Sequence, residues 1–221
     1  MKLTALKYGE TDLAESAILP QGKLGRARPI ALLFFLIEQG SQKILVDVGC
    51  DTMPGFELRN FCSPVEVLRE YGLNESEITD VVITHAHHDH IDALRYYPQA
   101  KVYIHQEALE AAARYLPSME NVRAFESSQR ITDGVWVQYV GGHAKGSSVV
   151  LIATSGKTLV LCGDECYAEE NLRCGIPTPS TVDPQKSLAF IKEYGKDVYQ
   201  SILFHDAHLV ETGRTRVLLT F

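Results

Sequence analysis

A cluster of possible metal ligands stands near position 85 of the chain. Four of the eight histidines and one aspartate fall within the six residues His85–His90. Imidazole nitrogen and carboxylate oxygen are the donors that suit zinc, and also manganese, iron or cobalt. An expression tag is also rich in histidine, but tags stand at chain termini and do not follow an apolar run such as Asp80–Ile83. We therefore interpret the segment as part of a metal site.

The spacing of these side chains predicts two neighbouring metal positions. In a strand, residues two apart point the same way, so His85 and His87 can direct two imidazoles at one point where the strand ends. Asp89 and His90 follow the turn, before a helix that we expect over Ile91–Tyr97, and can face a second point nearby. A catalytic zinc ion usually takes at least three ligands from the protein. Further ligands must therefore come from later in the chain.

Three later residues meet this requirement, namely His143, Asp164 and His205. Each follows a segment that we expect to be a strand, and functional side chains are often placed where a rigid element ends. Gly141 and Gly142, directly before His143, let the backbone turn tightly. A single histidine or aspartate at a strand end is more often a hydrogen-bonded structural residue. The evidence therefore lies in the three residues taken together with the first cluster.

The composition bounds the class of protein. The chain has 221 residues, of which 45% are hydrophobic, and we find neither an internal repeat nor a Pro-, Gly- or Ser-rich linker. We expect one domain that spans residues 1–221. The net charge of −7 argues against a general nucleic-acid or membrane-surface binder.

The localisation follows from the apolar pattern and the cysteines. The first residues do not resemble a signal peptide, and the longest apolar run, Ile30–Ile37, is too short to span a bilayer. Five cysteines without CxxC spacing suit reduced thiols. We expect a cytoplasmic enzyme, and the sequence leaves its oligomeric state open.

Strand and helix patterns recur in both halves of the chain. We predict strands over Lys2–Tyr8 as an edge strand, Ile30–Glu38, Lys43–Gly49, Asp80–Ile83, Lys101–His105, Val149–Ala153, Thr158–Cys162 and Ser201–Phe204, with an Asp-Gly turn inside Ile131–Val137. We predict helices from Ser63, with a capping box to Glu66, as far as Gly72, over Ile91–Tyr97, over Gln106–Leu116 until Pro117, and from Asp183-Pro184 to Tyr194. This order favours two sheets packed face to face with helices outside.

The segment Cys50–Cys62 lacks periodicity and is predicted to be a loop. It carries four large apolar side chains, Met53, Phe56, Leu58 and Phe61. These side chains form a substrate-facing lip or tuck the loop onto the core, and the sequence leaves both possibilities open.

The chain resembles the metallo-β-lactamase superfamily in one ordered set of residues: His85-x-His87-x-Asp89-His90, then His143, Asp164 and His205. The resemblance implies an α+β fold, an αββα sandwich of two mixed β-sheets with helices on both outer faces. It also implies two divalent metal ions, zinc first, with manganese, iron or cobalt as alternatives. By position, the first metal would take His85, His87 and His143, the second would take Asp89, His90 and His205, and Asp164 would bridge them.

Within the superfamily, the chain is most similar to the N-acyl-homoserine lactone hydrolases. Tyr167 follows Asp164 by three residues, as in those enzymes, and Asp183-Pro184 and Phe204-His205-Asp206 are similar too. The resemblance implies that Tyr167 hydrogen-bonds the substrate carbonyl or the tetrahedral oxyanion.

Two segments depart from the pattern of those lactonases. The loop Cys50–Cys62 is shorter than their substrate-binding region, which reduces the apolar surface available to an acyl tail. The segment Gly142–Ser147 lacks the second histidine that usually follows the motif glycine. Both departures are expected to affect the choice of substrate, and neither removes a predicted metal ligand.

These features predict a dinuclear metal hydrolase that acts on a small molecule. Metal binding lowers the pKa of water from about 15.7 to about 7, so a hydroxide bridging two ions would attack the carbonyl of a lactone or related ester. We assign Asp89 and Tyr167 as catalytic residues. A thioester hydrolase of the glyoxalase II type and a phosphodiesterase remain alternatives.

Two rival functions come from other classes. Di-iron redox members of this fold usually carry Glu where His87 stands and are fused to a flavin domain, and neither feature is present in the sequence. Non-catalytic binding relatives tend to lose ligands, whereas this chain keeps the full set. Both rivals are therefore weaker than a hydrolase.

The remaining histidines and two further aspartates receive supporting roles. His88 is expected to face solvent or a hydrogen-bond acceptor near the site, His105 to be structural, and His208 to lie on the surface. Asp47, as in the Asp-x-Gly segment of the superfamily, is expected to hold a ligand histidine by its second ring nitrogen. Asp206 could act similarly.

Overall fold

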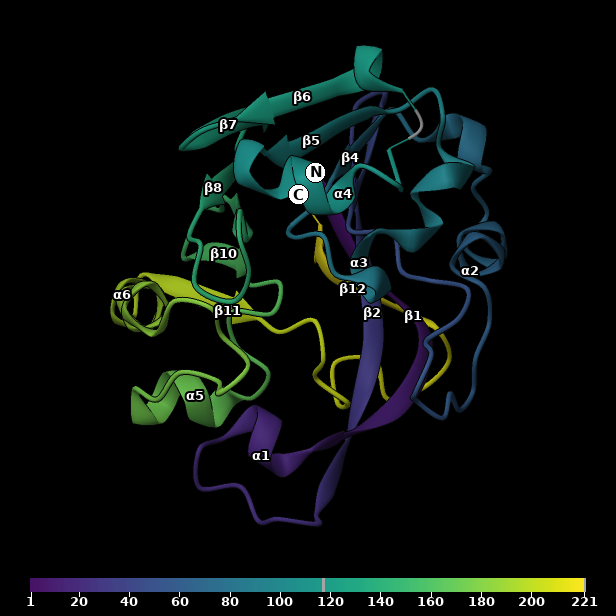
Figure 1. The fold of residues 1–221 in the computed structure, drawn as a ribbon. Helices are drawn as coiled ribbons and strands as arrows, with labels where there is room; N and C mark the ends of the chain where they lie inside the picture. Colours follow the sequence, from purple (N-terminus) through teal and green to yellow (C-terminus); the bar gives the residue numbers. More distant parts are fainter. Residues whose placement is uncertain (117, 221) are drawn as a thin grey trace.

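The computed structural model describes residues 1–116 and 118–220 of the chain. Within these residues the strands form two sheets (Figure 1). One sheet contains, in spatial order, β12 (Thr215–Thr220), β1 (Lys2–Ala14), β2 (Ala27–Gln39), β3 (Gln42–Val46), β4 (Asp80–Val82), β5 (Lys101–His105) and β6 (Val122–Phe125). The other contains β11 (Tyr199–Ile202), β10 (Thr158–Leu161), β9 (Ser148–Ile152), β8 (Val135–Tyr139) and β7 (Ser128–Thr132).

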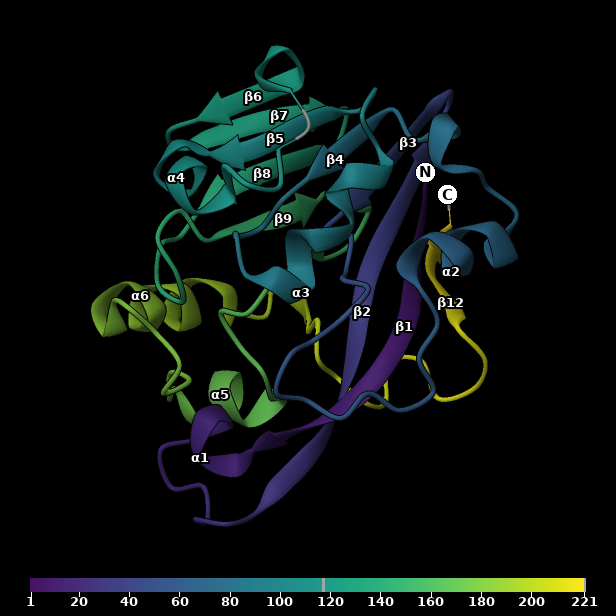
Figure 2. The same ribbon diagram turned by 45° about the vertical axis from the view of Figure 1, so that its right-hand side comes forward.

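Helices lie on the two outer faces of this pair of sheets (Figures 1 and 2). The α-helices are α1 (Glu15–Ile18), α2 (Pro64–Tyr71), α3 (His88–Ile91), α4 (Leu109–Ala112), α5 (Glu169–Cys174) and α6 (Pro184–Tyr194). Short 3₁₀ helices cover Glu75–Glu77, Asp92–Tyr96, Gln106–Ala108 and Met119–Asn121. Each sheet mixes parallel with antiparallel pairs, since β3–β4 and β10–β11 are parallel while β1–β2 and β8–β9 are antiparallel. The predicted αββα sandwich is confirmed.

Strand β2 contributes side chains to two cores, one between the sheets and one beneath the helices. Its side chains alternate between the two faces of the sheet, as in any strand. Phe35 and Ile37 enter the central core between the sheets, whereas Leu36 enters the outer core, together with Val67 and Leu68 of α2. A strand that is buried on both faces is apolar without interruption, which accounts for the run Ile30–Ile37 in the sequence.

The second sheet is covered on its outer face by α6. Phe190 and Ile191 of this helix pack on Val149 and Val160. The helix begins as the sequence predicts, because the Asp183 carboxylate accepts hydrogen bonds from the first backbone amides, 3.1 Å away. Both ends of the predicted helix are confirmed.

The prediction of an edge position for the first strand is wrong. β1 extends to Ala14 and pairs with β2 on one side and with β12 on the other. The sequence analysis missed β12 because most of its side chains are exposed, so it lacks the apolar pattern that marks a strand.

The histidine-rich segment also differs from its predicted conformation. β4 ends at Val82, so His85 and His87 stand on a loop rather than at the end of a strand. The helix expected from Ile91 begins at His88, which places Asp89 and His90 in its first turn. The chain then tightens into the 3₁₀ helix Asp92–Tyr96.

Several local boundaries differ for identifiable reasons. Ser63 does not form the predicted capping box, because its hydroxyl donates to Asp51 Oδ1 at 2.7 Å. The helix expected over Gln106–Leu116 is a 3₁₀ turn followed by the short α4, and Pro117 lies outside the described residues. The last predicted strand lies two residues earlier, as β11, so Phe204 follows the strand.

The described residues contain no helix with the length and apolar character needed to cross a bilayer.

Phe35 provides a test of the central core. Its ring lies at 4.6 Å from the ring of Phe204, at an angle of 62°, and both side chains are fully buried between the sheets. Replacement of Phe35 by Ala should lower the free energy of unfolding by about 3–5 kcal/mol, through lost burial and the cavity left behind. Phe56 is 40% exposed, so Phe56→Ala should change it by no more than about 0.5 kcal/mol. Urea denaturation measures both, and equal losses would contradict this description of the core.

Candidate metal centre

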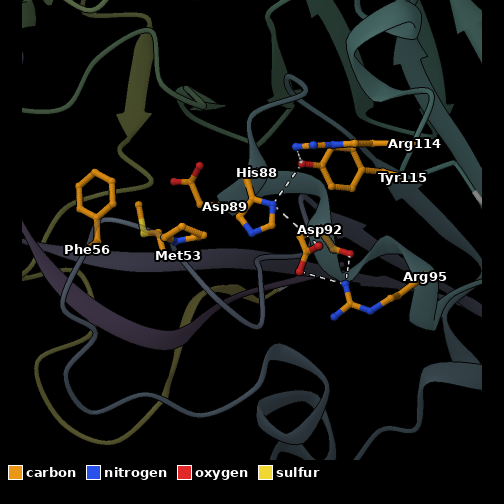
Figure 3. Close-up of a pocket in the computed structure, with 9 residues that line it drawn as sticks. Met53, Phe56, His88, Asp89, Asp92, Arg95, Arg114 and Tyr115 are labelled. Atoms are coloured by element: carbon orange, nitrogen blue, oxygen red, sulfur yellow. Dashed lines mark hydrogen bonds and ion pairs between the residues drawn. The ribbon is translucent and has the colours of Figure 1, made fainter.

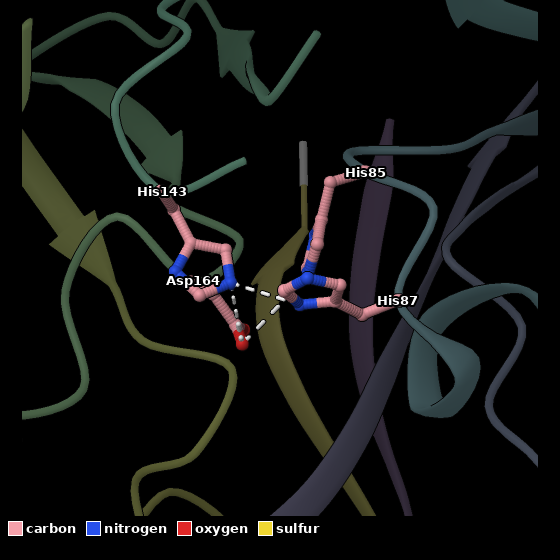
Figure 4. A group of neighbouring side chains, drawn as sticks. All are labelled: His85, His87, His143 and Asp164. Atoms are coloured by element: carbon pink, nitrogen blue, oxygen red, sulfur yellow. Dashed lines mark hydrogen bonds and ion pairs between the residues drawn. The ribbon is translucent and has the colours of Figure 1, made fainter. Parts of the chain in front are cut away.

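Four of the predicted ligands form one group near the end of β4. His85 and His87 come from the loop after β4, His143 from the loop between β8 and β9, and Asp164 from the segment after β10. One ligand atom of each lies within 4.8 Å of the others. His143 approaches from the side opposite His85 and His87, with Asp164 between them (Figure 4).

The other three predicted ligands form a second group. Asp89 and His90 belong to α3 and His205 follows β11, and one ligand atom of each lies within 4.8 Å of the others. The structure therefore brings all seven predicted residues together.

Asp164 joins the two groups. Its Oδ1 lies 3.0 Å from His90 Nε2 and 3.1 Å from His205 Nε2. Its Oδ2 lies 3.6 Å from His143 Nε2 and 3.8 Å from His85 Nε2. Each oxygen of one carboxylate thus faces a different set of imidazoles.

The polar atoms at this point fit divalent cations. Three buried atoms, His85 Nε2, His90 Nε2 and Asp164 Oδ1, have no hydrogen-bond partner among the described residues. A buried polar atom without a partner is costly, and a buried unpaired carboxylate is more so. The set consists only of imidazole nitrogens and carboxylate oxygens, which are the donors that zinc accepts. The residues present fit the group that the superfamily pattern implies.

Asp47 orients His90. Its Oδ2 lies 2.6 Å from His90 Nδ1, so the other ring nitrogen of His90 faces Asp164. The same carboxylate accepts hydrogen bonds from the backbone and the hydroxyl of Thr84, both at 2.7 Å. The predicted contact between Asp47 and a histidine of the site is present, and Thr84 is an anchor that the sequence analysis missed.

Backbone carbonyls orient two further histidines. His143 Nδ1 donates to the Ser180 carbonyl at 2.6 Å, and His205 Nδ1 donates to the Ala31 carbonyl at 2.9 Å. A carbonyl oxygen only accepts, so both rings keep the lone pair of Nε2 toward the site. Asp206 does not share this role, because its carboxylate accepts from the backbone amide of His208 at 2.8 Å.

A buried carboxylate that the sequence analysis missed supports the loop of His143. Glu165 Oε1 accepts from the amides of Gly142 and His143, at 3.1 and 3.0 Å, and from the Ser147 hydroxyl. A Cβ atom at Gly142 would lie 2.8 Å from the backbone nitrogen of Ser187, which cannot move aside as a side chain can, so only glycine fits there. No spacing in the sequence indicates this role of Glu165.

The electrostatics of the centre favour positive charge beside Asp164. Burial alone would raise the pKa of Asp164, but His90 and His205 hold it well below its ordinary value. Burial would lower the pKa of His90, yet Asp164, Asp89 and Asp47 hold it well above its ordinary value. For His85, burial prevails and lowers the pKa well below its ordinary value. The His85 imidazole is therefore uncharged at neutral pH and can bind a metal ion through a ring nitrogen. The Asp164 carboxylate is ionised, and a cation or a protonated group beside it stabilises its charge.

Tyr167 points its hydroxyl into the centre. This hydroxyl donates to Asp164 Oδ2 at 2.7 Å, and the ring stacks on His205 with centroids 5.3 Å apart. Burial, followed by the negative charge of Asp164, raises the pKa of Tyr167 well above its ordinary value. The side chain is thus a neutral hydrogen-bond donor at neutral pH.

A cavity of about 660 Å³ opens beside the centre (Figure 3). It is lined by Met53, Pro54, Phe56, His88, Asp89, Asp92, Arg95, Arg114 and Tyr115. Met53 and Phe56 show that part of the loop Cys50–Cys62 faces a cavity, while Leu58 packs on the outer core. One part of this loop therefore lines a cavity, and another part packs onto the core.

The other histidines take the supporting positions expected of them. His88 Nε2 donates to the Thr52 carbonyl at 2.8 Å. His105 stacks on Tyr139 at 4.0 Å and contacts the Glu126 carbonyl, which is a structural role. The side chain of His208 is 86% exposed.

Comparison with known families settles the family. The model of the metallo-β-lactamase superfamily matches residues 33–199. The chain belongs to the metallo-β-lactamase superfamily. This confirms the superfamily hydrolase predicted from the sequence, with a histidine and aspartate cluster suited to divalent metal.

One relative is similar over nearly the whole chain, and another over about half of it. N-acyl homoserine lactonase AiiB of Agrobacterium fabrum is 23% identical, over 93% of each chain. A hydroxyacylglutathione hydrolase of Actinobacillus pleuropneumoniae is 29% identical, over 47% of this chain and 42% of the relative.

Solved structures of two lactonases share the fold. An N-acyl homoserine lactone hydrolase with the product N-hexanoyl-L-homoserine at its catalytic metal centre has a TM-score of 0.82 and 20% identity, over 96% of each chain. The dizinc quorum-quenching lactonase AidC has a TM-score of 0.73 and 17% identity, over 92% of this chain and 86% of that one.

Metal analysis of an Asp164 variant tests the centre. Asp164→Asn keeps the shape of the side chain but removes the charge that both groups share, so its affinity for zinc should fall by at least about tenfold. Asp206→Asn is the matched control, since Asp206 contacts a backbone amide instead, and it should bind zinc as the wild type does. Titration of chelator-treated protein, followed by elemental analysis, measures both. Full zinc binding by Asp164→Asn would refute the centre.

Proposed function

We propose that this protein is a dinuclear metal hydrolase that opens lactones of the N-acyl-homoserine class. The observation that carries the proposal is the single carboxylate of Asp164, which faces two groups of imidazoles while it accepts the Tyr167 hydroxyl. Similarity to lactonase AiiB over 93% of each chain supports the choice of substrate.

The ligand assignment follows the two groups. One ion would be held by His85, His87 and His143, the other by Asp89, His90 and His205, with Asp164 shared. When bound, such ions lower the pKa of water and polarise a carbonyl group. Zinc is the first candidate for both ions, and manganese, iron and cobalt suit the same donors.

Tyr167 would stabilise the charge that develops on the substrate oxygen. Its hydroxyl is neutral and lies 2.7 Å from Asp164 Oδ2, at the edge of the centre. A carbonyl oxygen bound there would receive this hydrogen bond more strongly as it becomes an oxyanion. Donors of this kind contribute about 2.7–4 kcal/mol to the transition state.

Asp89 would move the proton that ring opening requires. Cleavage of the ester bond leaves an alkoxide, which must gain a proton before the product departs. The Asp89 carboxylate lines the cavity and also faces His90 and His205, at 3.6 and 3.9 Å from their Nε2 atoms. The attacking hydroxide brings one proton to the newly formed carboxyl group. Asp89 would accept this proton and pass it to the alkoxide oxygen, which leaves a carboxylate and an alcohol.

The cavity suits a small amphipathic substrate. Its volume of about 660 Å³ lies within the usual range for small-molecule sites. Met53 and Phe56 lie on the same side of the cavity as Asp89 (Figure 3). Together with Pro54, which also lines the cavity, they offer apolar surface against which an acyl chain would lie.

Thioester hydrolysis is the second candidate. The match to hydroxyacylglutathione hydrolases, at 29% identity, favours it, although that match covers 47% of this chain against 93% for the lactonase. A thioester presents the same carbonyl to the same residues. The two candidates differ in the leaving atom and are separated by a direct comparison of substrates.

A substrate panel tests the proposed function. Zinc-loaded protein should open N-hexanoyl-homoserine lactone, and activity should disappear on chelation and return on addition of zinc. Proton release measured in weak buffer follows the reaction. Turnover of S-lactoylglutathione without turnover of the lactone would replace the lactonase proposal with the thioesterase alternative.

Removal of the Tyr167 hydroxyl tests its assigned role. Tyr167→Phe should lower kcat for the lactone by about 10²–10³, while zinc content stays at two equivalents, because only the hydrogen bond to the transition state is lost. Tyr199→Phe is the matched control, since that hydroxyl contacts Glu193 instead, and it should keep the wild-type kcat. Steady-state kinetics on both variants decide the matter, and an unchanged kcat in Tyr167→Phe would remove Tyr167 from the mechanism.

A further inference from the structure

The cavity beside the metal centre carries one guanidinium group without a carboxylate partner. Four charged side chains line it, Asp89, Asp92, Arg95 and Arg114. Arg95 is neutralised by Asp92, at 2.9 Å, and by Asp51, while Asp89 belongs to the metal centre. Within residues 1–116 and 118–220, no carboxylate lies within ion-pair distance of Arg114. Its positive charge is therefore available to a ligand.

Arg114 is held in place by contacts that leave its charge uncompensated. Its guanidinium carbon lies 4.6 Å from the centroid of the Tyr115 ring, and it donates a hydrogen bond to the Tyr115 hydroxyl. A cation over an aromatic ring is attracted to the ring face without being neutralised. A guanidinium has five N–H donors, so most of them remain for a ligand.

A chain of hydrogen bonds fixes Tyr115 in turn. The Thr52 carbonyl only accepts, so His88 Nε2, 2.8 Å away, carries a proton. In the tautomer that carries its proton on Nε2, the other nitrogen, Nδ1, accepts from the Tyr115 hydroxyl, 3.1 Å away. The Tyr115 oxygen is left to accept from Arg114. Each group in this chain donates to the next, from Arg114 through Tyr115 and His88 to the Thr52 carbonyl.

The two ends of the cavity differ in character. Figure 3 shows Met53 and Phe56 on one side of His88, and Arg114 with Tyr115 on the other. A ligand that spans the cavity would place an apolar segment against Met53 and Phe56 and a negative group against Arg114. A single uncompensated positive charge, with Asp92 and Asp89 nearby, matches a monoanion better than a dianion.

We propose that the preferred substrate carries a carboxylate separate from its scissile ester carbonyl, and that Arg114 binds this carboxylate. The inference rests on the proposed function and narrows its substrate class to acidic N-acyl lactones. Arg114 is the specificity-determining residue, because its planar fork can engage a carboxylate through two parallel hydrogen bonds. Tyr115 and His88 are positioning residues that hold the guanidinium at the cavity wall.

Paired substrates test the proposal. N-hexanoyl-homoserine lactone is compared with its adipoyl analogue, in which a carboxylate replaces the terminal methyl group, and a shorter succinoyl analogue samples a second length. Wild-type enzyme should show a lower KM for at least one acidic analogue than for the hexanoyl lactone. Arg114→Ala should raise the ratio of the acidic to the neutral KM by about tenfold, with the change in KM rather than in kcat.

Further variants separate charge binding from general damage to the cavity. Arg123→Ala removes an exposed arginine whose contacts are the Glu120 and Val122 carbonyls, and it should keep the wild-type KM ratio. Tyr115→Phe keeps the ring but removes the anchoring hydroxyl, so it should shift the ratio in the same direction by about threefold. Raised salt should weaken the wild-type preference.

The outcomes distinguish this inference from the proposed function. A KM ratio that Arg114→Ala leaves unchanged for both acidic analogues would overturn the carboxylate site while the lactonase stands. If wild-type enzyme opens none of the lactones, the proposed function fails. In that case, calorimetric titration of the wild type and of Arg114→Ala with the adipoyl analogue measures binding of the carboxylate directly. Binding weakened about tenfold in Arg114→Ala supports the carboxylate site, and equal binding overturns it.

Discussion

The structure depends on a carboxylate that is buried among imidazoles. Asp164 is 4% exposed, and its two oxygens face nitrogen atoms of His90, His205, His143 and His85. A buried negative charge without compensation costs several kcal/mol, so positive charge has to accompany it. Two divalent ions would meet that requirement and would also supply partners for His85 Nε2 and His90 Nε2, which hydrogen bonds leave unsatisfied. The same requirement explains why so much of the surrounding structure serves to orient imidazole rings.

The scaffold meets this requirement by anchoring each loop separately. Asp47 holds His90, and Glu165 holds the loop that carries His143. The Ser180 carbonyl holds the ring of His143, and the Ala31 carbonyl holds the ring of His205. Ala31 lies in β2, so the first sheet reaches His205, which follows a strand of the second sheet. The centre thus lies where the two sheets meet, and neither sheet could form it alone.

Features with a regular local pattern were predictable from the sequence, and those that rest on distant contacts were not. The apolar run of β2 and the capped helix α6 follow from periodicity and end signals. The grouping of the seven candidate ligands was predictable because histidines and aspartates rarely cluster without a reason. The strand β12 lacks an apolar pattern and exists through pairing with β1, more than 200 residues earlier in the chain.

Supporting residues near the site were equally hard to predict. Glu165 acts through backbone amides 22 and 23 residues away, and the sequence contains no spacing that indicates this. The connection from Arg114 through Tyr115 to His88 joins segments that only the fold brings together. The contacts that anchor the candidate site therefore required the structure, whereas its histidines and aspartates could be selected from the sequence by residue type and order.

The central claim is that two cations lie on either side of the Asp164 carboxylate. X-ray diffraction from crystals of the zinc-loaded protein, collected above and below the zinc absorption edge, tests it most directly. The account predicts two anomalous peaks about 3.5–4 Å apart, as in other two-metal sites, with one carboxylate oxygen of Asp164 near each. Absence of zinc peaks at these residues, or one peak that leaves Asp164 uncoordinated, would contradict it.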